Sequence, residues 1–238
     1  MDRREFIKTC SAVAAASLAS PSLFTETLHA QSLELKTYKK ALLVDSKGAP
    51  INPEKLETGR EYIFFYPYRA TPCILINLER EIPPTEVKLS NGATYRWNGG
   101  VGPRKSIVAY CAICPHQMSY PTPEYSFINY YPKDKPSKIV KRGEVIQCCA
   151  HMSVFDPTKG GQVMDGPAHN PLTAIVLSYE EGKLFALGTL GKELYEDFFD
   201  VFKPELRKLY KSTRKAKKLV ETCKVLSMED YTSEIIRC

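Results

Sequence analysis

Two short stretches rich in cysteine and histidine place the strongest constraint on how this chain folds. The first is Cys111–His116 (CAICPH), and the second, Cys148–Ser153 (CCAHMS), begins 32 positions after His116. Taken as Cys-x-His and Cys-x-x-His, they offer two thiols and two imidazoles from two separate segments. A fold that uses all four side chains must bring two loops together and hold them rigidly, as scaffolds with functional loops do.

This set of side chains resembles the ligand set of a Rieske [2Fe–2S] cluster, in which two His replace two Cys on one iron. In this interpretation Cys114 and Cys148 bind one iron, and His116 and His151 bind the other. Cys149 lies next to Cys148, but the Cys-x-x-His spacing favours Cys148. One alternative is a zinc site, because zinc accepts tetrahedral mixtures of the same ligands. The other is that two unrelated surface loops contain Cys and His by coincidence.

The resemblance extends beyond the ligands. Rieske proteins place a Ser and an aromatic residue beside the cluster sulfurs, and here these positions are Ser153 and Phe155. Ser153 is therefore expected to donate a hydrogen bond to a sulfide. Phe155 stands where high-potential members have Tyr, which predicts a potential below that of the quinol-oxidising type. The turn Gly166-Pro167-Ala168 resembles the proline loop that covers the cluster.

The first residues of the chain have the pattern of an export signal. Met1–Lys8 (MDRREFIK) contains a twin-arginine pair and is followed by a short, Ala-rich apolar run, Cys10–Leu18. We predict a twin-arginine signal over residues 1–30, cleaved before Gln31, and hence a periplasmic protein. A membrane anchor needs about 20 apolar residues. An uncleaved signal that acts as a weak anchor is the alternative.

Residues 31–191 are predicted to form an all-β domain, an antiparallel sandwich of the Rieske type with the cluster in its loops. Short β-branched and aromatic runs bounded by Pro or Gly are typical of such a fold. The expected strands are 41–45, 61–66, 73–78, 107–111, 145–149, 173–179 and 184–187, the last two joined by a turn at 180–183. Between the two cysteine motifs, 117–147 is a Pro- and Tyr-rich insertion that either covers the cluster, forms a docking surface or packs on its own aromatics.

Residues 192–238 are predicted to be a basic, amphipathic helical extension. Apolar residues recur every three or four positions from Leu194 to Cys223, and Pro204 favours the start of a second helix. Lys203–Lys224 contains nine Lys or Arg and two Glu, a net charge of +7, so the rest of this +6 chain sums to −1. The basic face is a solvated surface, a site for an acidic partner or a contact with anionic lipid. Nucleic acid is not expected for an exported chain.

The closest subfamily resemblance is to the small subunit of arsenite oxidase. It is carried by Phe65–Pro67, Thr71–Cys73, Gly100–Pro103 and Ile107–Tyr110, within a region of about 61–191. It implies an electron-transfer subunit beside a larger molybdopterin oxidoreductase, with a c-type cytochrome or similar protein as acceptor. The quinol-oxidising Rieske subunit of a membrane complex is the alternative. Arsenite itself stays an analogy, because the carrier does not touch the substrate.

Two further points follow from counting. The positions of the loop-to-loop disulfide of many Rieske proteins are Ser119 and Ala150 here, so that bridge is absent, and a Cys111–Cys149 disulfide is an open option. A Rieske oxygenase also needs a mononuclear iron held by two His and a carboxylate. The chain has four His, and His29, His116 and His151 are already assigned. We therefore expect an electron carrier and not a catalyst on its own.

Overall fold

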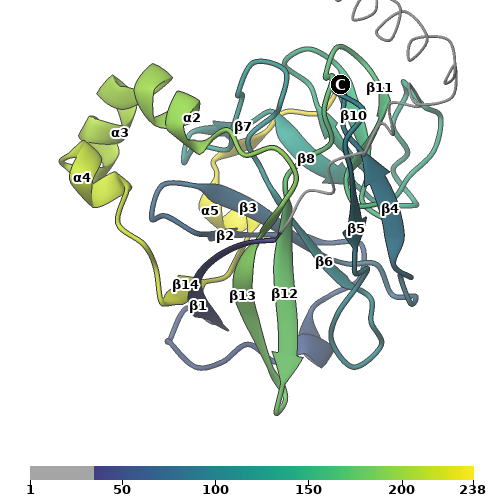
Figure 1. Cartoon of the computed structure of the whole chain (residues 1–238), viewed down its shortest axis with the longest axis horizontal. Helices are drawn as coiled ribbons and strands as arrows, with labels where there is room; N and C mark the ends of the chain where they lie inside the picture. Colours follow the sequence, from purple (N-terminus) through teal and green to yellow (C-terminus); the bar gives the residue numbers. More distant parts are fainter. Residues whose placement is uncertain (1–34) are drawn as a thin grey trace, which may run out of the picture. The chain divides into compact units, whose positions relative to one another are not determined.

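The computed structural model describes residues 35–238, and most of its strands lie in two sheets. The larger sheet has eight strands, in the order β14 (Thr222–Lys224), β1 (Lys36–Val44), β13 (Lys183–Leu190), β12 (Ala174–Glu180), β6 (Ile107–Cys111), β3 (Pro72–Asn77), β2 (Glu61–Phe65) and β15 (Leu226–Ser227). The smaller sheet has the order β11 (Gln162–Asp165), β10 (Ser153–Asp156), β9 (Val145–Cys148) and β8 (Ile128–Tyr131). In Figure 1 the long β12–β13 hairpin points down, and the smaller sheet lies at the opposite end, beside the end of the chain.

Two ribbons and a few short helices complete the fold. One ribbon pairs β4 (Thr85–Lys88) with β5 (Thr94–Trp97), and the other pairs β7 (Tyr125–Ser126) with β16 (Glu234–Ile235). The helices are the 3-10 turn η1 (Pro53–Lys55), α2 (Tyr195–Val201), α3 (Lys203–Tyr210), α4 (Thr213–Ala216) and α5 (Met228–Tyr231). Most strand pairs are antiparallel, and β1–β14 and β7–β16 are parallel. The predicted all-β class with helices near the C-terminus is confirmed.

The predicted strands correspond to β1, β2, β3, β6, β9, β12 and β13, and β3 and β6 are buried on both faces. All six residues of β3 and all five of β6 are buried. Successive side chains of a strand point to opposite faces, so alternate residues enter different cores. Cys73 and Leu75 pack into a core that also contains α2 and α3, whereas Ile74 and Ile76 pack into the core shared with the smaller sheet.

The hairpin predicted at 180–183 is also confirmed. Strand β12 pairs with β13 down to Glu180 and Lys183. The two residues between them, Glu181 and Gly182, both have positive φ, 49° and 78°. Positive φ at both central residues matches the twist of two antiparallel strands, and glycine adopts it without a steric cost.

The insertion at 117–147 contributes a strand to the smaller sheet. Strand β8 pairs with β9 in the register Ile128↔Cys148 and Tyr131↔Val145. All four residues of β8 are buried. The insertion therefore supports the second cysteine motif directly, because β9 ends at Cys148.

The prediction of a purely helical extension over residues 192–238 is wrong beyond α4. Leu206, Ala216 and Cys223 of the apolar stripe are buried, whereas Leu209 is 43% exposed. However, Cys223 lies in β14, which pairs with β1, and β15 pairs with β2 at the other edge of the larger sheet. The segment after α4 is thus part of the scaffold and not a separate extension. Its strands pair with the backbone N–H and C=O groups that the edge strands β1 and β2 leave unpaired.

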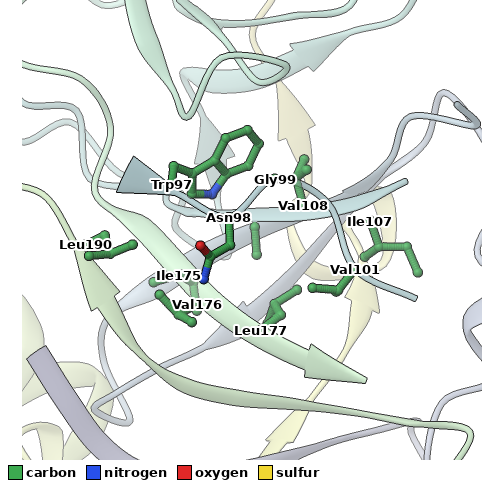
Figure 2. A pocket seen from close by; sticks show the side chains of 11 residues that line it. Trp97, Asn98, Gly99, Val101, Ile107, Val108, Ile175, Val176, Leu177 and Leu190 are labelled. Carbon is green, nitrogen blue, oxygen red and sulfur yellow. The ribbon is translucent and has the colours of Figure 1, made fainter. Parts of the chain in front are cut away.

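One small cavity lies inside the scaffold. It has a volume of about 20 Å³, room for about one water molecule, between the segment after β5 and strands β6, β12 and β13. Figure 2 shows Trp97 and Asn98 on one side of it and Val176 and Leu190 on the other. The lining contains no Cys or His, so this cavity is a packing gap away from the two cysteine motifs. Among residues 35–238, no helix is long and apolar enough to cross a membrane.

Candidate metal centre

The first cysteine motif forms a tight loop at the end of β6. Alternation along the strand continues into the loop, so that Cys111 packs into the core with α2 and α3 while Cys114 packs into the core shared with the smaller sheet. The loop is closed by hydrogen bonds from the Cys114 N–H to the Ser119 carbonyl (2.9 Å) and from the Met118 N–H to the Cys114 carbonyl (2.8 Å). The motif therefore presents Cys114 toward the smaller sheet.

The second motif is the hairpin loop between β9 and β10. Cys148 and Ser153 are paired residues of the two strands, which leaves 149–152 as the loop. In β9, Ile146 and Cys148 face the core shared with the larger sheet, whereas Cys149 faces a separate cluster with Tyr131 and Val154. Alternation thus selects Cys148, and not Cys149, as the cysteine that faces the first loop.

The thiols of Cys114 and Cys148 meet in a buried, hydrogen-bonded pair. Both residues are at most 2% exposed. The hydrogen bond with Cys114 lowers the pKa of Cys148 to about 7, and the N–H groups of Ala150 and His151 and the Ser119 hydroxyl lower it further against the cost of burial. The same hydrogen bond and burial raise the pKa of Cys114.

The imidazoles of the same two loops, His116 and His151, contact each other. The rings of His116 and His151 stack edge to face, with centroids 4.7 Å apart and an interplanar angle of 82°. The Nδ1 atom of His116 is buried and has no hydrogen-bond partner. A buried nitrogen without a partner is costly unless something binds it. His151 is exposed, so the pair links a buried nitrogen to the surface.

This donor set fits a two-iron cluster. Two thiols form one pair and two imidazoles form the other, as the two irons of a His₂Cys₂ cluster require. Within residues 35–238, no group of three or more His, Cys, Asp and Glu side chains is arranged to hold a single metal ion. The unsatisfied Nδ1 of His116 offers a free lone pair where a ligand atom is needed.

The turn at Gly166-Pro167-Ala168 packs on the second loop. The Ala168 N–H donates to Oγ of the buried Ser153 (3.2 Å). Gly166 has a φ of +88°, and a Cβ placed on it would lie 2.4 Å from the Met152 carbonyl oxygen. Only glycine allows this close approach. The turn thus lies against the second loop, with Pro167 exposed. That it covers the cluster stays a prediction.

Phe155 lies in the same core as the two thiols. It is fully buried in β10, in the same apolar cluster as Cys114 and Cys148. The proposed effects of Phe155 and Ser153 on the potential stay predictions.

The Cys111–Cys149 disulfide, which the sequence left open, does not form in the structure. Cys149 is instead bonded to Cys238, with their Cα atoms 5.7 Å apart, and Cys111 is a free, buried cysteine opposite Cys73. The reason is the alternation described above, which turns Cys111 and Cys149 into different cores. No spacing pattern along the chain indicates a partner 89 positions away. Sequence reasoning also missed the hydroxyl of Ser119 beside the Cys148 sulfur.

The comparisons with known proteins agree with this geometry. A family model described as the Rieske [2Fe-2S] domain matches residues 77–180, which include all four predicted ligands. The chain is 28% identical over 153 residues to iodate reductase subunit IdrB of Denitromonas iodatirespirans, covering 64% of this chain and 68% of that protein. It is 31% identical over 136 residues to iodate reductase subunit IdrB of Pseudomonas sp. (strain SCT), covering 57% of this chain and 56% of that protein.

Two solved structures are also similar to the chain. The soluble domain of Rieske protein II (soxF) from Sulfolobus acidocaldarius is 24% identical, with a TM-score of 0.45, and covers 64% of this chain and 78% of that one. The quaternary ammonium Rieske monooxygenase CntA is 12% identical, with a TM-score of 0.35, and covers 72% of this chain and 37% of that one. The part of the chain that matches the Rieske [2Fe-2S] domain, residues 77–180, thus contains both the paired thiols and the paired imidazoles.

Proposed function

We propose that Cys114 and Cys148 hold one iron of the [2Fe–2S] cluster, that His116 and His151 hold the other, and that the chain is the electron-transfer subunit of a larger oxidoreductase. The observation that carries the assignment is the meeting of the two buried thiols and the two imidazoles from separate loops. When bound, the cluster takes up and releases one electron at a time.

The chain's own residues bury the thiol side of the site and leave the imidazole side open to a partner. The thiols are enclosed by the core, and backbone N–H groups of both loops point at their sulfurs. Such donors stabilise the extra negative charge of the reduced cluster and raise its potential. The imidazole of His151 reaches the surface beside Met152, which is 46% exposed. Electron transfer weakens steeply with distance, so a partner would dock at this exposed edge.

The similar proteins support a larger partner. The two relatives described above are named subunits of an iodate reductase. With the resemblance to the arsenite oxidase small subunit, this favours a molybdopterin enzyme that acts on a small oxyanion. We further propose that an acidic surface, on that subunit or on a c-type cytochrome, contacts the basic residues of α3 and α4. Lys208 and Arg214 are exposed there, within the segment of net charge +7.

We propose a periplasmic location, reached by the twin-arginine route. The support is the pattern at Met1–Lys8. Residues 1–30 lie outside the described residues.

The first experiment is a redox titration of the purified chain monitored by EPR. A rhombic Rieske-type signal in the reduced state is expected, with a potential above that of plant-type ferredoxins. His151→Cys should retain a cluster but lower its potential, because a thiolate adds negative charge where a neutral imidazole stood. A colourless protein that contains zinc, or an unchanged potential in the variant, contradicts the assignment.

The partner is tested separately. The tagged chain is isolated from periplasmic extract at low salt, and molybdenum is measured in the eluate. Molybdenum in proportion to the chain, lost on washing at high salt, supports the proposal, since charge contacts are screened by salt. An eluate without molybdenum overturns the molybdopterin partner.

A further inference from the structure

The segment Ser233–Cys238, here called the strap, runs along the insertion that supports the second loop. Its strand β16 pairs in parallel with β7. The Ile236 N–H donates to the Ser126 carbonyl (2.9 Å), and the Asn129 side chain donates to the Ile236 carbonyl (3.0 Å). Asn129 is fully buried, so the strap provides a partner for a side chain that water does not reach. The strap is therefore held against strands β7 and β8 by specific hydrogen bonds.

Arg237 fixes the strap to two buried groups. It donates to the Tyr130 carbonyl (2.9 Å) and contacts the carboxylate of Glu61 (3.3 Å), and its guanidinium lies 5.1 Å from the centre of the Tyr131 ring. Glu61 is 3% exposed and also accepts a hydrogen bond from the Tyr130 N–H (2.6 Å). Because β8 lies beside β9, these contacts join the strap to the strand that carries Cys148.

Cys238 completes the attachment with a covalent bond. Its sulfur is bonded to Cys149, and its N–H donates to the Tyr131 hydroxyl (2.9 Å). The Cys149 N–H in turn donates to the Phe127 carbonyl (2.7 Å). Cys149 is thus held from its side chain and from its backbone, directly between Cys148 and the loop residues that follow.

We infer that Cys238 is a positioning residue for the iron–sulfur cluster, acting through Cys149 on the second ligand loop. The loop contributes the Cys148 sulfur, the His151 imidazole and the N–H groups of Ala150 and His151 that point at that sulfur. With the disulfide in place, the backbone of Cys149 is fixed, and these groups keep their orientation. Groups that orient a metal ligand change both the retention and the electronic properties of the metal.

This inference rests on the proposed function, and its test uses the full chain with its cluster. Wild type is compared with Cys238→Ser and with Cys149→Ala/Cys238→Ala, which leaves no lone thiol beside the cluster. The matched control is Cys223→Ser, because Cys223 is an equally buried cysteine whose sulfur contacts the Phe65 carbonyl (3.2 Å), outside the strap. Three quantities are measured, namely the rate of cluster loss in a chelator, the EPR g-values and the reduction potential.

Both strap variants should lose the cluster about 10- to 100-fold faster than wild type, the range found when a group that orients a metal ligand is removed. Their remaining cluster should have altered g-values and a lower potential, because the N–H donors to the Cys148 sulfur are less well held. A role confined to global stability does not change the spectrum of the folded, loaded fraction. Cys223→Ser should match wild type in all three measurements.

A second measurement avoids variants that fail to fold. Wild-type protein with its cluster reduced by ascorbate is treated with dithiothreitol, which supplies two electrons and two protons to the Cys149–Cys238 bond and becomes a cyclic disulfide. Alkylation and mass spectrometry then quantify the two new thiols. Faster cluster loss in proportion to these thiols supports the inference.

The failures are distinguishable. Wild-type protein without a Rieske signal overturns the proposed function and this inference with it. A normal wild-type signal, with unchanged retention and g-values after loss of the disulfide, overturns only the inference. The same holds if Cys238 is found as a free thiol in the loaded wild-type protein.

Discussion

The two cluster loops are held in different ways. The first loop, 112–119, is closed by hydrogen bonds among its own residues, between Cys114, Met118 and Ser119. The second loop, 149–152, depends on residues far away in the sequence, the turn at Gly166–Ala168 and the bond from Cys149 to Cys238. A loop with local contacts is specified by its own sequence, whereas a loop with distant contacts is a property of the whole fold. Four predictions, taken from the largest expected effect to the smallest, test this comparison.

The largest effect is expected where the loops meet. Cys148→Ser should abolish the cluster, because its thiolate joins the second loop to the iron shared with Cys114. Iron content and the EPR signal measure the loss. Cys223→Ser is the control for removing a buried cysteine, and a cluster that survives at normal occupancy in Cys148→Ser contradicts the assignment.

A second effect concerns Glu61, to which the strap is attached. Burial raises the pKa of Glu61 to about 8 from an ordinary value of 4.5, and the Tyr130 N–H and Arg237 limit the rise. Between these values the folded state binds a proton that the unfolded state does not. Its contribution to stability is therefore present below pH 4.5 and is lost as the pH rises to 8, by at most about 1.4 kcal/mol per pH unit.

Glu61→Gln should flatten this dependence in denaturant titrations between pH 5 and 8. Glu81→Gln is the control, because Glu81 is exposed and forms only a surface ion pair with Lys105. Equal pH dependence in wild type and Glu61→Gln argues against the raised pKa.

A third effect tests the support of the second loop by the 166–168 turn. Gly166→Ala should destabilise the protein by about 1–3 kcal/mol, because it combines a positive φ with a clash against the Met152 carbonyl. The control is Gly182→Ala, which has a similar φ of +78° but no atom within 4 Å of the new methyl group. The free energy of unfolding of each variant is measured by thermal unfolding. The difference between the two losses of stability gives the cost of the clash with the Met152 carbonyl. No difference means that the turn does not support the loop.

The smallest effect is a change of potential within the second loop's hairpin. Phe155→Tyr should raise the reduction potential by about 20–60 mV, the equivalent of one hydrogen bond to a ligand sulfur for a one-electron couple. Ser153→Ala should lower it by a similar amount. Both potentials are measured by EPR-monitored titration. The control is Ser178→Ala, which removes a strand serine whose hydroxyl donates a hydrogen bond to Glu180. A lower potential in Phe155→Tyr contradicts the proposed role of this position.

The strands and the ligand motifs were predictable because both follow from local patterns. Strand β6 has the predicted bounds, Ile107–Cys111. A short apolar run rich in β-branched and aromatic residues is typical of a strand that is buried on both faces. The four side chains were chosen by spacing alone, and the structure brings them together in two pairs. The helices between Leu194 and Ala216 were predictable from the apolar stripe, whereas the strand at Cys223 was not, because period and burial do not reveal which edge strand lacks a partner.

By itself, the sequence indicated the four candidate ligands, strands β6 and β9 beside them and the alternation that turns Cys148 inward. The tertiary structure decided which residues hold the second loop. Cys149 has Cys238 as its partner, 89 positions away, because β8 and β16 bring the strap beside β9. Strand periodicity is a property of neighbouring residues, and it can therefore be read along the chain. The choice among distant cysteines depends on which core each one faces, and only the packed sheets determine that.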